Sequence, residues 1–112
     1  MKKAVQNLLY PAFLVQKYGV SGNEGYAFVL VAKACIGKDW CEIKNRELEK
    51  LLLVSNRTAI RYVKYLEAKG LLRCEYKSVD NGAGRSGIYE RKIFVNRENP
   101  DVDDYMKVLE KR

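Results

Sequence analysis

The sequence contains no histidine, only two prolines, and three cysteines that form no C-x-x-C pair. Without histidine it lacks the most common general base of enzymes and the imidazole that most often binds zinc. An odd number of cysteines without metal-ligand spacing suggests neither a metal site nor a complete disulfide framework. We therefore expect no metal, no cofactor and no enzymatic activity. We also expect reduced thiols at Cys35, Cys41 and Cys74, with a Cys35–Cys41 bond left as an open alternative.

Long hydrophobic runs are also missing. The longest unbroken apolar stretch, residues 26–32, is far shorter than the roughly 20 residues of a membrane-spanning helix. The N-terminal segment begins like a signal peptide, but Gln6, Asn7 and Pro11 interrupt its apolar part and no cleavage pattern follows. The sequence therefore predicts a cytoplasmic protein with no membrane partner.

What the chain does contain is enough apolar sequence for one folded domain over residues 1–112. Hydrophobic residues make up 47% of the 112 residues and charged residues 31%, which is typical of a globular domain rather than a disordered tail. There are 21 lysines and arginines against 14 acidic residues, for a net charge of +7. This excess favours nucleic acid, acidic lipid or an acidic protein as the partner.

The hydrophobic pattern predicts a mixed order of helices and strands. Residues 1–20 form an N-terminal arm or short helix, residues 21–96 the core, and residues 97–112 a C-terminal helix. In the core, Ser21 and Glu24 have the spacing of a capping box before an apolar, buried helix. A short edge strand begins at Trp40, and a helix follows with Asn45 as its expected N-cap.

A second pair of elements follows after a tight turn. Ser55 is the expected N-cap of a helix over residues 55–69, which Gly70 ends. Two segments with period-two alternation then surround the glycine-rich stretch DNGAGRSG, which predicts an antiparallel hairpin over residues 72–95. At the C-terminus, Asp101 is the expected cap of the last helix.

This order of helix, strand, helix, turn, helix and hairpin is that of an α+β winged helix-turn-helix, with a three-helix core and a two- to three-stranded antiparallel wing. The segment ELEKLLLVSNRTAIRYVKYLEAKGLL, residues 47–72, resembles the helix-turn-helix and wing start of bacterial and phage winged-helix DNA-binding proteins. The resemblance extends over residues 23–96, and it implies a DNA-binding function. The matching positions are Leu48, Leu51, Val54, Ser55, Thr58, Ile60, Leu66, Glu67, Gly70, Leu71 and Leu72.

The helix over residues 55–69 supports this independently, because its helical period separates an apolar side from a basic side. The apolar side contains Ala59, Val63 and Leu66, and the basic side contains Arg57, Arg61 and Lys64. Arginine can pair bidentately with guanine in the major groove, and asparagine with adenine. The candidate DNA-binding residues in this helix are Ser55, Asn56, Arg57, Thr58, Arg61, Lys64 and Tyr65.

The hairpin adds further positive charge. Residues 55–92 contain nine basic and four acidic residues, so most of the excess charge lies in this helix and the wing. Lys77 and Arg85 are the candidate contacts to phosphates or the minor groove, since the glycines around Arg85 allow a close approach of the backbone.

The remaining apolar residues leave one alternative open. The aromatic residues Phe28, Trp40 and Phe94, with Tyr26 and Tyr89, fall in apolar patterns that predict burial in the core. The stripe Val102, Tyr105, Met106 and Leu109 either packs against its own domain or pairs with a second copy in a homodimer. The N-terminal arm is the other candidate dimer contact.

These observations favour sequence-specific binding of double-stranded DNA by a small transcriptional regulator. Two alternatives remain. An apolar first helix, a W-C-x-I strand and a helix-turn-helix are also similar to N-terminal domains of phage replisome organisers, which implies a role in replication initiation. A winged helix that binds a protein partner has the same fold.

Overall fold

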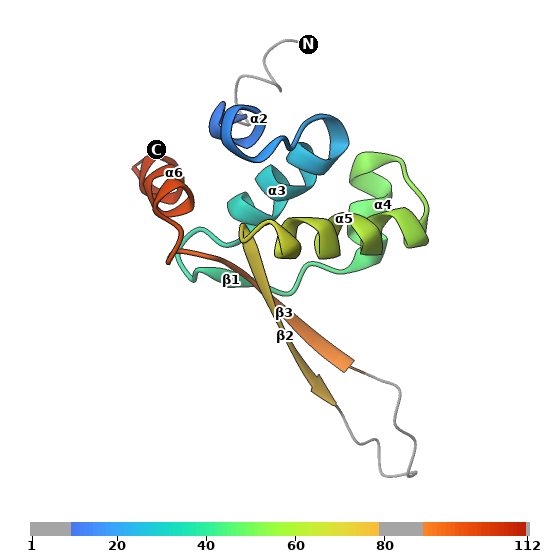
Figure 1. The fold of residues 1–112 in the computed structure, drawn as a ribbon. Coiled ribbons are helices and arrows are strands. Elements are labelled where there is room, and N and C mark those ends of the chain that lie inside the picture. Colours follow the sequence, from blue (N-terminus) through green and yellow to red (C-terminus); the bar gives the residue numbers. More distant parts are fainter. Residues whose placement is uncertain (1–9, 79–88, 112) are drawn as a thin grey trace, which may run out of the picture.

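The computed structural model describes residues 10–78 and 89–111 of the chain. Over these residues the fold is α+β, with five helices and one three-stranded antiparallel sheet (Figure 1). No helix in this part of the chain combines the length and apolar character needed to cross a bilayer. The elements are α2 Phe13–Tyr18, α3 Gly22–Ala34, β1 Trp40–Cys41, α4 Asn45–Leu52, α5 Asn56–Ala68, β2 Leu72–Ser78, β3 Tyr89–Val95 and α6 Pro100–Glu110.

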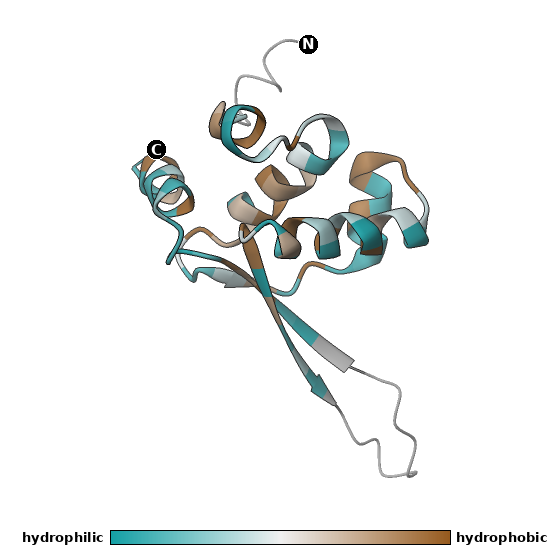
Figure 2. Cartoon of the chain, viewed as in Figure 1, coloured by the Kyte–Doolittle hydropathy of each residue, from teal (hydrophilic) through white to brown (hydrophobic). Residues whose placement is uncertain are grey.

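The sheet has the strand order β1-β3-β2, so the short strand β1 lies at an edge as expected. In the register, Ile93 of β3 is flanked by Cys41 of β1 and Cys74 of β2. Strands β2 and β3 form a hairpin that projects away from the helices (Figure 1). Its base is apolar and its outer part is more hydrophilic (Figure 2), so only the base packs against the helical layer.

The core lies between the helices and the base of the hairpin. Fully buried side chains come from most elements, including Phe28 of α3, Leu48 of α4, Leu66 of α5, Ile93 of β3 and Met106 of α6. Helix α3 is the central helix, because most of its length is covered by neighbours. This burial explains why α3 is apolar nearly all round in the sequence.

The C-terminal helix packs back on its own chain. The four residues of its apolar stripe are at most 7% exposed, and the Tyr105 ring contacts Phe28 of α3 and Phe13 of α2 with centroids 5.8 and 6.1 Å apart. The alternative in which this stripe forms a dimer contact is therefore wrong, because its apolar surface is already buried. The described part of the N-terminal segment, α2, covers the same cluster.

Arg97 links the start of the C-terminal segment to the rest of the fold. Its guanidinium donates to Asp39 at 2.7 Å, to Asp103 at 2.8 Å and to Glu110 at 3.0 Å. Hydrogen bonding from Arg97 lowers the pKa of Asp103 below its usual value, and the same contacts raise the pKa of Arg97. These ion pairs hold α6 against the turn that precedes β1.

Two of the predicted helix caps are wrong, and a third has the predicted position without the capping hydrogen bond. Ser21 does precede α3 in an extended conformation, but its side chain makes no capping hydrogen bond. Asn45 is the first residue of α4 rather than its cap, and the Lys44 backbone N–H donates to Glu47 at 2.8 Å instead. Asn99, not Asp101, caps α6, because proline at position 100 is the first residue of the helix and the start lies two residues earlier than predicted.

The three cysteines meet around one residue of β3. Cys41 and Cys74 are the cross-strand neighbours of Ile93, and the Cys35 thiol donates to the Ile93 carbonyl at 3.6 Å. All three are free thiols. The pKa of Cys35 is raised by its hydrogen bond with the neighbouring Cys41 thiol and by burial. The same hydrogen bond lowers the pKa of Cys41 to about 7. The expected reduced state is thus the one in this structure.

Two of the aromatic residues expected in the core lie elsewhere. Phe28 is fully buried as predicted, but Trp40 and Phe94 are only partly buried and lie on the sheet face opposite the row of Cys41 and Ile93. Tyr26 is half-buried at the edge of the core, and the side chain of Tyr89 lies outside the described part of the structure. The helices cover one face of the sheet, so an aromatic residue on the other face cannot enter the core.

Candidate nucleic-acid interface

The candidate interface is built on α4, a three-residue turn and α5. Leu53 ends α4 in the left-handed conformation, with φ 57° and ψ 49°, and the next N–H, that of Val54, donates back to the Glu49 carbonyl at 3.1 Å. Ser55 then begins α5 as predicted, since its hydroxyl accepts from the Thr58 backbone N–H at 3.2 Å. The turn therefore sets the angle between the two helices.

Leu53 allows a test of this turn. A leucine in the left-handed region is strained, and this side chain is 89% exposed, so it gains little from packing. We expect Leu53→Gly to raise the free energy of unfolding by about 0.5–1 kcal/mol, measured by urea denaturation. Leu51→Gly is the matched control. It is also exposed but helical, and it should lower stability by about 1 kcal/mol. Equal effects of the two substitutions would contradict the turn geometry.

Helix α5 separates its side chains as the sequence predicts. Ala59, Val63 and Leu66 are buried against α3, α4 and β2. On the opposite side Arg57, Arg61 and Lys64 are exposed to solvent; these three residues are called the basic ridge below. The buried side anchors the helix, so that the ridge is presented on a rigid element.

The acidic residue of α5 does not weaken this ridge. Glu67 is the only acidic residue in the helix, and its carboxylate is half-buried and accepts from the Cys74 backbone N–H of β2 at 3.3 Å. Its charge is therefore turned toward the sheet. The charged residues on the solvent-facing side of α5 are therefore all cations, which favours an anionic partner.

The N-terminal residues of α5 are held by local hydrogen bonds. The Ser55 hydroxyl donates to the Thr58 hydroxyl at 3.1 Å, and the Asn56 amide nitrogen donates to Glu49 of α4 at 2.8 Å. Asn56 remains exposed, and its amide oxygen accepts no hydrogen bond from the described residues. The cap residues are thus fixed in position, and Asn56 also joins the two helices of the turn.

The other predicted contacts lie farther from the ridge. Tyr65 is half-buried, with the Lys69 ammonium 5.4 Å from its ring centroid, and Lys77 is exposed on β2. Arg85 lies outside the described residues. Sequence reasoning missed Tyr76, because alternation groups it with the core-facing Leu72 and Cys74. The hairpin extends beyond the helices, so Tyr76 remains 58% exposed. Only the length of the hairpin relative to the helical layer reveals this.

The exposed polar side chains of this surface are cations, hydroxyls and an amide. Cations, hydroxyls and amides are the groups that contact phosphates and base edges. In the described part of the chain, histidine, cysteine and acidic residues form no cluster that could hold a metal ion. Comparisons of the chain with family models, with curated proteins and with solved structures gave no match.

Proposed function

We propose that this protein is a winged helix-turn-helix that binds double-stranded DNA sequence-specifically and acts as a small transcriptional regulator. In this proposal α5 enters the major groove with the basic ridge toward the bases, and the hairpin of β2 and β3 contacts the backbone or minor groove. The observation that carries the proposal is the exposure of Arg57, Arg61 and Lys64 on a helix whose other side is buried.

The dimensions of α5 support this role. A helix of 13 residues is about 20 Å long, and an α-helix fits the width of the major groove of B-DNA. Arg57 and Arg61 are four residues apart and lie on one side of the helix, so both can face base edges together. Recognition by base contacts needs such a rigid arrangement, and the packed side of α5 supplies it.

The hairpin supports contacts to the sugar-phosphate backbone. Its outer part extends beyond the helical layer, and it carries exposed Lys77 and Tyr76, which are residue types that contact phosphates (Figure 1). Such contacts position a protein on the duplex without reading its sequence. We therefore assign specificity to the basic ridge and general affinity to the hairpin.

Salt dependence tests this assignment. A protein that contacts about five to eight phosphates should lose duplex affinity with a log–log salt slope of about −4.5 to −7. Lys77→Ala should weaken binding to all duplex sequences alike and reduce the magnitude of this slope by about one. Fluorescence anisotropy with labelled duplexes at several salt concentrations measures both effects.

Lys107→Ala is the matched control for Lys77→Ala, because it removes the same charge from an exposed site on α6, away from α5 and the hairpin. We expect it to leave the slope unchanged. A flat salt dependence of the parent protein, or equal effects of the two substitutions, would contradict DNA binding through this surface. Selection of bound sequences from a random duplex pool then gives the target and shows whether it is palindromic.

A further inference from the structure

The face of the sheet opposite the helices carries two partly exposed aromatic rings that a ligand could reach. In the register, Trp40 of β1, Phe94 of β3 and Arg73 of β2 form one row across the three strands. The neighbouring row, Cys41, Ile93 and Cys74, faces the helices. Because side chains alternate along a strand, the first row points to the opposite side of the sheet, away from α3 and α5.

Cations lie directly over both rings of this row. The Lys92 ammonium is 4.4 Å and the Lys38 ammonium 5.0 Å from the Trp40 ring centroid, and the Arg73 guanidinium is 4.3 Å from that of Phe94. We call these five residues the aromatic–cation face. Among the described residues, neither Lys38 nor Lys92 forms an ion pair, whereas Arg73 pairs with Glu75 at 2.6 Å.

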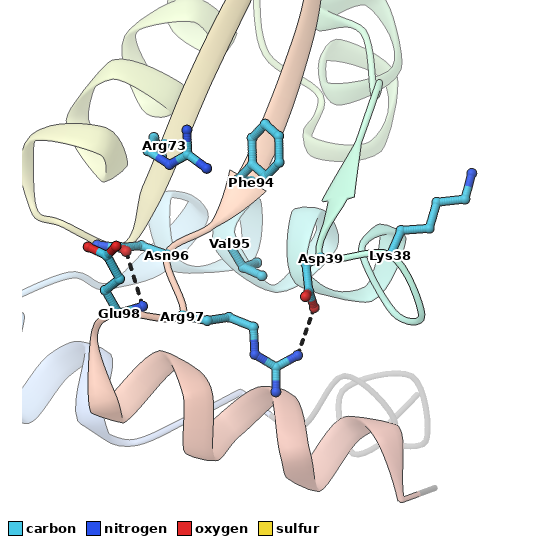
Figure 3. Close-up of a pocket in the computed structure, with 8 residues that line it drawn as sticks. All are labelled: Lys38, Asp39, Arg73, Phe94, Val95, Asn96, Arg97 and Glu98. Atoms are coloured by element: carbon cyan, nitrogen blue, oxygen red, sulfur yellow. Dashed lines mark hydrogen bonds and ion pairs between the residues drawn. The ribbon is translucent and has the colours of Figure 1, made fainter.

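A hollow of about 450 Å³ continues this face toward α6 (Figure 3). Phe94 and Arg73 line one side, Lys38 and Asp39 another, and residues 96–98 close it. Its volume lies within the usual range for small-ligand sites. Arg97 turns toward Asp39 and pairs with it, which neutralises that carboxylate (Figure 3). The charged residues that line the hollow are three cations, Lys38, Arg73 and Arg97, and two acidic residues, Asp39 and Glu98.

We propose that the aromatic–cation face binds single-stranded nucleic acid, with bases stacked on Trp40 and Phe94 and phosphates held by Lys38, Lys92 and Arg73. Every base has a π-face that can stack on an aromatic ring, and this is the way in which single strands are bound without sequence preference. The rings are partly exposed and each lies beside a cation, which are the two features that such a site requires.

The cations over the rings are compatible with stacking. Lysine and arginine have long, flexible side chains, so an incoming base can displace them from the ring while they move to its phosphate. The lysine and arginine side chains then stay at the site and pair with the phosphate. A duplex cannot use the rings in this way, because its bases are stacked on each other. The site is therefore distinct from the basic ridge of α5 and does not depend on it.

Trp40 also provides the probe, since it is the only tryptophan in the protein. Titration of the full chain with oligodeoxythymidine of about eight nucleotides should quench its fluorescence in a saturable way. Two further ligands are titrated for comparison: thymidine monophosphate, and an oligoglutamate with as many residues as the octamer has nucleotides. We expect the octamer to bind more tightly than the monophosphate, and oligoglutamate to bind without a change in tryptophan fluorescence.

Variants test the residues, with anisotropy of a labelled octamer as the readout. Trp40→Leu should weaken binding by about 5- to 150-fold, as expected for the loss of a stacked base. Lys92→Ala, at an exposed position of β3, should weaken it more than the charge-matched Lys107→Ala. Arg61→Ala should leave octamer affinity unchanged, and Trp40→Leu should leave duplex affinity unchanged. The last two results separate this site from the proposed duplex surface.

Three outcomes would overturn the proposal. Equal affinity for monophosphate and octamer would assign the face to a free nucleotide. Saturable quenching of Trp40 fluorescence by oligoglutamate, with an affinity as tight as that of the octamer, would assign the face to an acidic protein segment. Unchanged octamer affinity in both Trp40→Leu and Lys92→Ala would place single-strand binding elsewhere, and this result would leave the duplex proposal standing.

Discussion

Replacing Arg61 by alanine should weaken binding to the preferred duplex by about 5- to 150-fold, or about 1–3 kcal/mol, the usual cost of a lost bidentate contact to a base. Affinity for unrelated duplexes should fall much less, because Arg61 would contribute only charge there. The expected result is thus a loss of specificity as well as of affinity. Anisotropy titrations with the selected site and a scrambled duplex measure the ratio. Arg57→Ala should behave in the same way.

Arg61→Lys is the matched control, because it keeps the charge but not the planar fork of the guanidinium. We expect it to restore binding to the scrambled duplex and not the preference for the selected site. Since Arg61 is exposed, neither substitution should change the unfolding midpoint by a measurable amount. If Arg61→Ala binds the selected site as tightly as the parent protein, α5 is not the helix that reads the bases.

Replacing Phe28 by alanine should have the largest effect on stability. Phe28 is fully buried in α3 between Phe13 of α2 and Tyr105 of α6, with ring centroids 6.2 and 5.8 Å away. Removing a buried phenylalanine costs about 3–5 kcal/mol, because transfer energy is lost and a cavity remains. Small domains have a total stability of about 5–15 kcal/mol, so the variant should unfold at a much lower urea concentration.

Val15→Ala provides the comparison for Phe28→Ala. Val15 lies on α2 but is 52% exposed, so its truncation should change stability by less than about 0.5 kcal/mol. Unfolding followed by circular dichroism in urea gives both values. Because Phe28 joins α2, α3 and α6, we expect one cooperative transition in each variant. A small effect of Phe28→Ala, or separate unfolding of α6, would mean that α6 is not part of the core.

Local signals in the sequence were sufficient for most elements. Ser55 and Gly70 delimit α5, and its helical period separates Ala59, Val63 and Leu66 from the basic ridge, so both sides of this helix were predicted correctly. Alternation likewise identified β2 and β3. These features depend on residues within one or two turns or along one strand, and such short-range patterns are directly visible in a sequence.

The sequence by itself thus determined the order of the elements, the charge of the protein and the two sides of α5. Only the tertiary structure decided that the α6 stripe is buried within its own chain and that Trp40 and Phe94 lie outside the core. Periodicity tells which residues share a face, but it does not tell which neighbour covers that face. Coverage depends on contacts such as Phe28 with Tyr105, between residues far apart in the chain.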